Sequence, residues 1–225
     1  HSFSRRQRQM CIRDRSTVNV LENENRFPIN YKLPPGIVRE QLNNFNSVIR
    51  QNEQSLSLRV QDLEPKDLKG VYKNIDVDMR QYKRIKMFIH AESLPNRTPL
   101  PGDGSLDDLD KSMVAFMRIG TDMTENYYQI EVPLQPTPYT EGVANNLSAE
   151  EVWQPESNSI DAPLSLFTGA KAKSIQNRSL VGATYFDEDL NQIDEFTPIS
   201  SLPGDKKYKI AVRGNPTLGQ VRTLM

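Results

Sequence analysis

The 225-residue chain has little of what reactive sites are commonly built from: one cysteine, two histidines and one tryptophan. A single cysteine forms no disulfide within the chain, and zinc sites that need several thiolates are excluded. No apolar run reaches the ~20 residues of a membrane-spanning helix. The sequence also lacks a Gly-rich phosphate loop and the H-E-x-x-H and G-x-S-x-G motifs. We therefore expect no enzyme activity, no catalytic residues, no cofactor and no metal site.

The first fifteen residues, HSFSRRQRQMCIRDR, are unusual, because they hold five arginines and the only cysteine. A basic arm for nucleic acid has this composition, and so does a fusion scar. Back-translation of residues 5–15 gives the codons of a transposase-type sequencing adapter. We therefore interpret residues 1–15 as adapter-derived and not native. We expect them to be extended or disordered, with almost no contact to the folded domain.

Removing residues 1–15 changes the charge balance. Lys plus Arg falls from 28 to 23 and Asp plus Glu from 29 to 28, so the net charge moves from −1 to −5. The basic arm was the one argument for nucleic-acid binding, so no nucleic-acid partner is expected. Both ends look cut, since an adapter-like stretch stands at the front and residues 220–225 stop within a strand-like pattern. We expect an internal fragment that self-associates through the edge that a truncated last strand exposes.

The remaining chain divides by pattern. Residues 16–54 are polar, are interrupted by Pro34-Pro35-Gly36, and read as a connector with one short helix within 37–50. From residue 55 the apolar period becomes two, which predicts short strands at 55–60, 85–90, 113–119, 128–134 and 207–212. Because Pro133 lies inside one pattern, that strand is expected at a sheet edge or beside a bulge. The predicted core comprises Leu56, Leu58, Val60, Ile85, Met87, Ile89, Ala115, Met117, Ile119, Ile130, Val132, Ile210 and Val212.

Residues 137–205 are a long polar excursion with two helix starts. Ser148-Ala-Glu-Glu151 is a capping box, and Asp161-Ala-Pro163 is an N-cap followed by a first-turn proline. A loop of this length suggests an insertion packed against one side of the strands. The sequence thus predicts an all-β fold: a β-sandwich over 55–225 with a partly helical insertion at 137–205.

Two candidate sites have weak support as ligand sites. The stretch from Asp103 to Asp110 gathers four carboxylates, and calcium prefers such ligands, but the spacing does not match an EF-hand loop. We interpret it as a solvated connection, and whether it binds calcium stays open. His90 lacks a second imidazole for a metal, so we expect it to pack or to hydrogen-bond.

Two further candidates are also better explained structurally. Asp76 and Asp78 lie two apart, and Asp78 is expected to cap the turn that follows it. Four aromatic residues are candidates for a sugar-stacking platform, although aromatic residues on strands are more often core or cross-strand partners. They are Trp153, Tyr127, Tyr128 and Tyr139.

Beyond these patterns, eight segments resemble the SprA family in the same order. The resemblance spans nearly all of residues 30–225 and is weakest at 137–205. The segments are LPPGIVRE (33–40), RQNEQSLSL (50–58), GVYKN (70–74), DMRQYK (78–83), MFIHAE (87–92), AFMRIG (115–120), YYQIE (127–131) and GQVRTLM (219–225). Separately, the motif D-x-x-x-Y-x-x-I-x-M-F at 78–88 resembles the entry strand of galactose-binding-like jelly rolls.

The resemblance implies a function that the residues alone do not. The SprA family comprises very large outer-membrane proteins of Bacteroidota, required for gliding motility and for the type IX secretion system. The chain lacks the strand pattern of a membrane barrel, so we expect it to be a soluble structural or interaction domain of the translocon. The implied partners are other parts of the same large chain and secretion-system subunits, at the outer membrane and on the cell surface. The alternative is a cell-surface carbohydrate-binding module.

Overall fold

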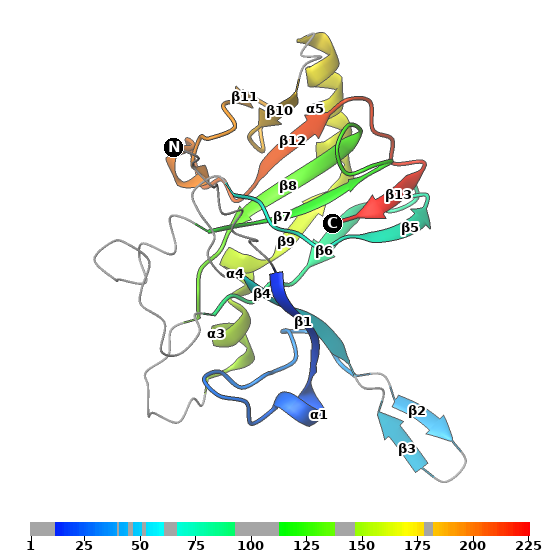
Figure 1. The fold of residues 1–225 in the computed structure, drawn as a ribbon, viewed down its shortest axis with the longest axis vertical. Helices are drawn as coiled ribbons and strands as arrows, with labels where there is room; N and C mark the ends of the chain where they lie inside the picture. The colour runs from blue at the N-terminus through cyan, green and yellow to red at the C-terminus, as the bar shows by residue number, and fades with distance from the viewer. Residues whose placement is uncertain are drawn as a thin grey trace, which may run out of the picture. The chain divides into compact units, whose positions relative to one another are not determined.

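The computed structural model describes residues 12–39, 41–44, 47–50, 53–60, 67–92, 113–137, 147–177 and 182–225 (Figure 1). The chain divides into two units. Unit 1 comprises residues 1–33 and 37–71, and unit 2 comprises residues 34–36 and 72–225. The calcium candidate at Asp103 to Asp110 and the aromatic candidate Tyr139 lie outside the described residues.

Unit 1 is built from two antiparallel strand pairs. β1 (Ile12–Asn19) pairs with β4 (Gln54–Val60), and β2 (Gln41–Asn44) pairs with β3 (Ser47–Arg50). The short helix α1 (Val20–Asn23) follows β1 directly. Asn19 caps this helix, because its side-chain oxygen accepts a 3.0 Å hydrogen bond from the backbone N–H of Glu22.

Three sequence predictions fail in unit 1. Residues 12–15 pair with β4, so the expected lack of contacts is wrong for them, while residues 1–11 lie outside the described part. The helix predicted within 37–50 is wrong because β2 and β3 form a strand pair there. Asparagines at 43, 44 and 46 favour a turn over a helix, and the β-branched pair at 48 and 49 favours a strand.

The third failure concerns the predicted core. Leu56, Leu58 and Val60 do lie on a strand, but they are 59%, 41% and 41% exposed. β4 pairs with β1 alone among the described residues. A period of two shows that alternate side chains share a face, but it does not show what covers that face.

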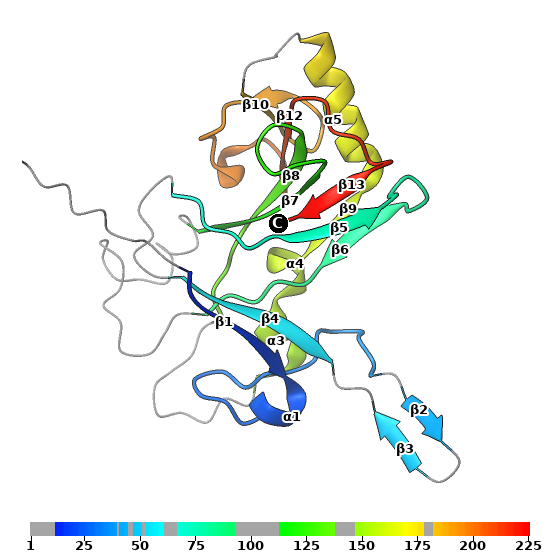
Figure 2. The same ribbon diagram turned by 45° about the vertical axis from the view of Figure 1, so that its right-hand side comes forward.

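Unit 2 contains one large antiparallel sheet with the strand order β11-β10-β12-β8-β7-β13-β5 (Figures 1 and 2). Its strands are β5 (Lys73–Val77), β7 (Val114–Gly120), β8 (Tyr127–Pro133), β10 (Ala183–Phe186), β11 (Gln192–Ile193), β12 (Lys209–Arg213) and β13 (Val221–Leu224). The remaining elements are β6 (Arg84–Met87), β9 (Ile160–Pro163), α3 (Ala149–Trp153), α4 (Pro155–Asn158), α5 (Leu164–Gln176) and the 3₁₀ helix η1 (Ile199–Ser201).

The core lies between one face of this sheet and a second layer made by the β6–β9 pair and α5. Ile130 and Ile210 point from the sheet toward Ile160 on β9 and Phe167 on α5, and all four side chains are fully buried. The all-β sandwich with a small helical part is therefore confirmed. Six predicted core residues are buried as expected: Met117, Ile119, Ile130, Val132, Ile210 and Val212. Four more are half-buried at the margin of the core: Ile85, Met87, Ile89 and Ala115.

Pro133 does not mark an edge, because β8 lies in the middle of the sheet between β12 and β7. Pro133 is the last residue of β8 and pairs with Val114. Toward the other neighbour, pairing stops two residues earlier, where Glu131 lies opposite Lys209 at the start of β12. An N–H at this position would point toward β12, but β12 does not extend this far along β8. Proline therefore removes no hydrogen bond from the sheet.

The predicted insertion at 137–205 is more than a peripheral addition. Its first capping box forms as expected: Ser148 accepts from the N–H of Glu151, whose carboxylate accepts from the N–H of Ser148. The second predicted helix is present as α5, which begins at Leu164, but its predicted cap is wrong, since Asp161 lies in β9 and the N-cap of α5 is Pro163. The same region also supplies β10 and β11 to the large sheet.

β13 is an interior strand of the sheet, paired with β5 on one side and β7 on the other. Figure 2 shows it entering between these neighbours. Beyond Leu224, the N–H and C=O groups of Met225 bond reciprocally to Arg118 at 2.9 Å each. The backbone groups of Phe116 and Val114 face the same side as those of Arg118, and no described residue pairs with them there. The expected self-association through this side of β7 stays a prediction.

Candidate functional site

Unit 2 contains an open pocket of about 350 Å³. Four segments that are far apart in sequence line it. They are the turn after β5 (Met79, Arg80, Tyr82), β8 (Tyr128), α5 (Leu164, Ser165, Thr168, Lys171), and the connection from β12 to β13 (Thr217, Leu218).

The turn after β5 forms because Asp78 caps it, as the sequence predicts. The Asp78 carboxylate accepts a 3.0 Å hydrogen bond from the N–H of Arg80, and Tyr82 N–H donates to Met79 O at 3.1 Å. Arg80 also donates to Asp78 through its side chain, with a shortest distance of 2.6 Å. These bonds from Arg80 lower the pKa of Asp78 to about 2. Asp76, its predicted neighbour, is an exposed residue of β5.

The turn is fixed to the rest of the pocket by backbone and side-chain bonds. Met79 N–H donates to Leu218 O at 2.7 Å. Two side chains reach the carbonyl oxygen of Pro216: the Tyr128 hydroxyl at 3.1 Å and Lys171 Nζ at 2.7 Å. Burial raises the pKa of Tyr128 to about 12, so its hydroxyl remains a donor. The pocket walls are therefore held in place by contacts within unit 2.

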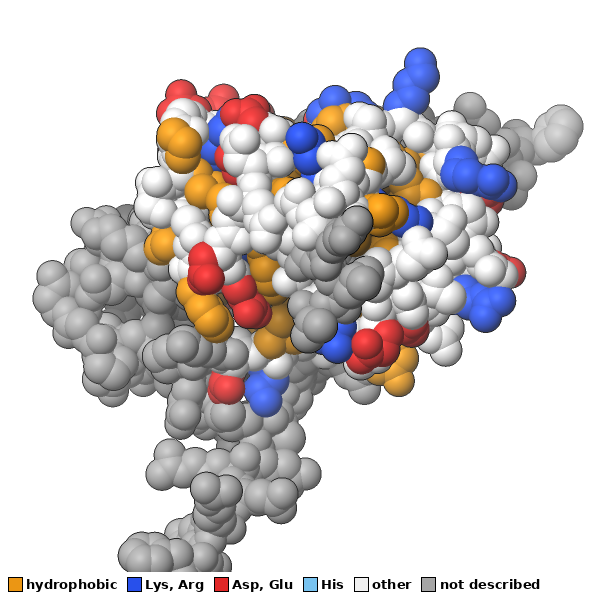
Figure 3. All heavy atoms as spheres, turned by 90° about the horizontal axis from the view of Figure 1, so that it is seen from above, with side chains coloured by type: hydrophobic (Ala, Val, Ile, Leu, Met, Phe, Trp, Pro, Cys, Tyr) orange, Lys and Arg blue, Asp and Glu red, His pale blue; other side chains and the backbone are white. Residues whose placement is uncertain are grey.

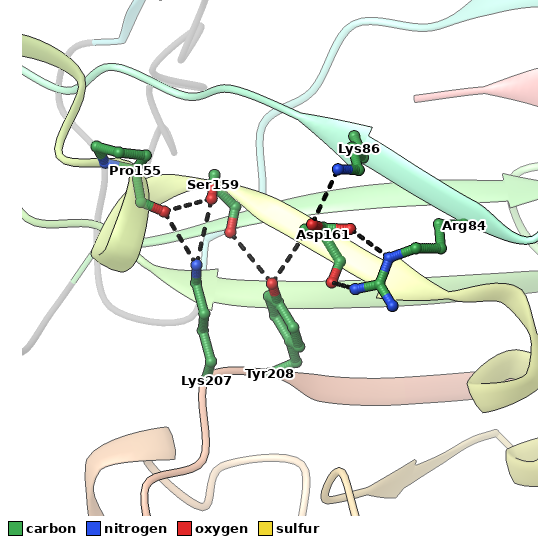
Figure 4. A network of polar contacts seen from close by, with 7 residues as sticks. All are labelled: Arg84, Lys86, Pro155, Ser159, Asp161, Lys207 and Tyr208. Atoms are coloured by element: carbon green, nitrogen blue, oxygen red, sulfur yellow. Dashed lines mark hydrogen bonds and ion pairs between the residues drawn. The ribbon is translucent and has the colours of Figure 1, made fainter. Parts of the chain in front are cut away.

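A second polar cluster joins β6, β9 and the start of β12 (Figure 4). The Asp161 carboxylate forms ion pairs with Arg84 Nε at 2.7 Å and with Lys86 Nζ at 3.2 Å. The hydrogen bond from Arg84 is the main cause of the lowered pKa of Asp161. The Asp161 N–H donates to the Tyr208 hydroxyl at 2.9 Å. Since the two cations and Asp161 are substantially exposed, this cluster is a surface ion-pair group with modest stabilising value.

The same cluster brings Ser159 and Lys207 together, with Nζ 3.2 Å from the serine oxygen (Figure 4). Burial lowers the pKa of Lys207, a feature of serine–lysine catalytic pairs. However, the hydroxyl of Ser159 donates to Pro155 O, and Lys207 donates to that carbonyl at 3.1 Å. The serine proton therefore points at a carbonyl and not at a base, and the contacts fasten α4 to β12.

A third cluster lies on the face of the sheet opposite the core. Lys209 Nζ lies 3.0 Å from Glu131 Oε2 and donates to Glu195 O at 2.6 Å. Arg118 donates to Gln129 Oε1 at 2.9 Å and stacks 3.9 Å above the Tyr127 ring. Lys209 and Glu131 retain only 9% and 12% of their side-chain exposure. This face carries buried, paired charges where the opposite face is apolar.

The other sequence candidates lie in packed positions. Tyr127, Tyr128 and Trp153 are buried, so these three do not form an exposed sugar platform. The His90 ring lies 5.8 Å from the Trp153 ring, which fits the expected packing role. Among the described residues, no group of three or more His, Cys, Asp or Glu side chains could hold a metal ion.

The described surface also bears on possible partners. On the face shown in Figure 3, Lys and Arg side chains are interspersed with Asp and Glu, and hydrophobic side chains form small patches between them. A nucleic-acid footprint requires a concentrated basic patch, which this face does not have. Within the described residues, no helix has the length and apolar character needed to cross a membrane.

Fold, pocket and polar clusters define a β-sandwich unit whose charges mainly fasten one element to another. The chain matches, over residues 6–225, the model of a family described as motility related/secretion protein. It therefore belongs to this family, SprA_N, which confirms the resemblance seen in the sequence. The match includes residues 6–15, and the adapter origin of that stretch stays a hypothesis. No curated protein matches the chain.

Sequence reasoning did not find the pocket. Its lining residues come from segments between Met79 and Leu218, and none carries a recognisable binding motif. The one part of the pocket that was recognisable in the sequence is the turn at Asp78, which we interpreted as structural. The contact between Ser159 and Lys207 was also missed, since their separation along the chain gives no indication that they meet.

Proposed function

We propose that this chain is a structural and interaction part of the type IX secretion translocon, needed for protein export and gliding motility. The observation that carries the proposal is the match to the motility and secretion family over residues 6–225. Its partners are other parts of the same large chain and subunits of the secretion system. Its place is at the outer membrane, with the extracellular side favoured over the periplasm.

The proposal includes the absence of enzymatic activity. Among the described residues, the pair that resembles a nucleophile and its base is Ser159 with Lys207, and it supports a fastening role because both side chains bond to the same backbone carbonyl. General-base activation needs the serine proton directed at the base. We therefore expect no hydrolysis or group transfer from this pair.

The test is a replacement of the chromosomal gene in a gliding member of the Bacteroidota. Phe167→Asp places a carboxylate at a fully buried core position and unfolds unit 2. It should abolish gliding and secretion. Ser159→Ala combined with Lys207→Met should retain both. Intact export with the Phe167 variant, once immunoblotting shows the protein lost, would contradict the proposal. Loss of export with the double variant at normal protein level would favour an enzyme.

The membrane side is tested with an epitope tag inserted after Gly204, where an added side chain meets only the end of Lys206. Antibody labelling of intact cells is expected. Labelling that requires an opened outer membrane would place the unit in the periplasm.

A second candidate, a carbohydrate-binding module, keeps one specific observation in its favour. Three of the aromatic residues that first suggested it, Tyr127, Tyr128 and Trp153, are buried, but the pocket beside Tyr82 presents an exposed ring together with polar side chains.

A further inference from the structure

The pocket beside Tyr82 has the size of a small-molecule site. Its volume of about 350 Å³ is at the lower end of the range of known ligand pockets. Its floor is apolar, because Tyr128, Leu164 and Leu218 are buried beneath it. Tyr82 is 56% exposed and lines the wall, so its side chain is accessible to a ligand.

The charges of the lining all have one sign. Arg80 and Lys171 line the pocket, and no carboxylate is among its ten lining residues. Asp78 holds Arg80 through Nε and Nη2, so no described residue accepts from Nη1. Lys171 gives one hydrogen bond, to Pro216 O, and an ammonium group has three donors. Both cations thus keep donors for a ligand, and the ligand that suits them is an anion.

The uncharged polar groups of the lining are hydroxyls. Thr168 donates to Ser165 O at 3.0 Å, which leaves its oxygen able to accept. Thr217 accepts from the N–H of Gly219 at 3.2 Å, which leaves its hydroxyl proton able to donate. Together with Ser165, these groups offer both donors and acceptors around an apolar floor. A ligand with several hydroxyl groups and an apolar face uses all of them.

The lining is also preorganised, which reduces the entropy lost on binding. Met79 N–H is bonded to Leu218 O, and Lys171 and Tyr128 share Pro216 O as an acceptor. Gly219 packs against Arg80, since a Cβ built on this glycine would lie 3.0 Å from Arg80 Nε. The arginine is thus held between its carboxylate partner and the backbone.

We propose that this pocket binds an acidic monosaccharide, a hexuronate or a sugar of the same chemistry. The carboxylate lies between Arg80 and Lys171, the C–H face of the ring stacks on Tyr82, and the hydroxyls bond to Ser165, Thr168 and Thr217. This site goes beyond the role in export, because a structural part of a translocon does not need it. It would allow the same unit to contact acidic glycans.

Titration calorimetry of the unaltered chain with glucuronate tests the proposal without any substitution. Saturable binding is expected, with glucose and the methyl ester of glucuronate at least about tenfold weaker, because a charged hydrogen bond is lost. Equal binding of glucose and glucuronate would overturn the role of the two cations. Equal binding of inorganic phosphate and glucuronate would show an anion site without sugar recognition. No saturable binding of glucuronate would overturn the proposal entirely.

Two substitutions locate the site. Lys171→Gln should weaken glucuronate binding about tenfold, and Tyr82→Ala should weaken both the acid and its ester. Lys173→Gln is the matched control, because Lys173 is an exposed residue of the same helix outside the pocket. Unchanged affinity in both pocket variants would place the sugar elsewhere. Since none of these residues carries the proposed export function, secretion should be normal in the same variants, so the two proposals fail independently.

Discussion

The buried ion pair of Lys209 and Glu131 allows a quantitative test of how the polar face of the sheet is held. Lys209→Met removes the ammonium group and leaves Glu131 almost buried, with its remaining hydrogen bond from Gln129 Nε2 at 2.6 Å. The replacement also frees the carbonyl of Glu195, which Lys209 reaches at 2.6 Å. Removing one partner of a buried ion pair lowers the free energy of unfolding by about 3–5 kcal/mol. Because Gln129 still bonds to Glu131, we expect the low end, about 3 kcal/mol, or a drop in Tm of about 6–12 °C.

The double variant separates pairing from burial. Lys209→Met with Glu131→Leu removes both charges and fills the space with apolar atoms, so its stability should lie within about 1 kcal/mol of the unaltered chain or exceed it. The matched control is the exposed pair of Arg84 and Asp161, whose side chains are 48% and 40% exposed. Arg84→Met should cost less than about 1 kcal/mol.

The assay is urea unfolding followed by circular dichroism. The free energies of unfolding are compared between variants whose m-values, the slopes against urea concentration, are equal. A cost of Lys209→Met no larger than that of Arg84→Met would refute a stabilising role of the buried pair. A double variant as unstable as the single one would also refute it, since the loss would then come from packing and not from the unpaired carboxylate.

Three further results are expected. Burial opposes ionisation of Asp122, but hydrogen bonds from the Asn126 side chain and three backbone amides outweigh it and hold its pKa well below the ordinary range. The stabilisation is therefore complete above about pH 4 and is lost as pH falls through the lowered pKa, so the cost of Asp122→Asn, about 1–3 kcal/mol at pH 7, should shrink in acid unfolding curves. Gly214→Ala should lower the free energy of unfolding by about 1–3 kcal/mol, because φ is +64° and the new Cβ would lie 2.1 Å from a backbone oxygen; a neutral effect in urea titration would contradict the loop geometry. Ile130→Ala should cost about 2–5 kcal/mol and Leu58→Ala less than about 1 kcal/mol in the same titration, and equal costs would mean that β4 is buried after all.

The strands of the large sheet were predictable where one face is buried and the other polar. The alternation at 128–134 and 207–212 placed Ile130, Val132, Ile210 and Val212 on the core side, where the structure has them. The capping box at Ser148 was equally readable, because its two hydrogen bonds depend on neighbours three residues apart. Local chemistry and a one-sided burial pattern are both visible in a sequence.

The sequence does not show which segments pair with one another in space, and this accounts for most of the wrong predictions. Asp161 resembles an N-cap locally, but its carboxylate finds Arg84 across the β6–β9 pair. β10 is short and carries Thr184 and Tyr185 among its four residues, so the sequence pattern predicted a polar insertion there. In the structure β10 pairs with β12. The proposed sugar site shares this difficulty, since Tyr82, Lys171 and Thr217 meet only through the fold.

The strand pair of β1 and β4 has a consequence for how the chain reaches its final state. Two-stranded sheets are at best marginally stable in water, and β4 leaves Leu56, Leu58 and Val60 largely open to solvent. Unit 2 carries a large core cluster, whereas the side chains of Leu56, Leu58 and Val60 on β4 are not part of it. We therefore expect hydrogen exchange to be fast in β4 and slow in β8. Equally slow exchange in β4 and β8 would show that the β1–β4 pair is as stable as the large sheet without further burial.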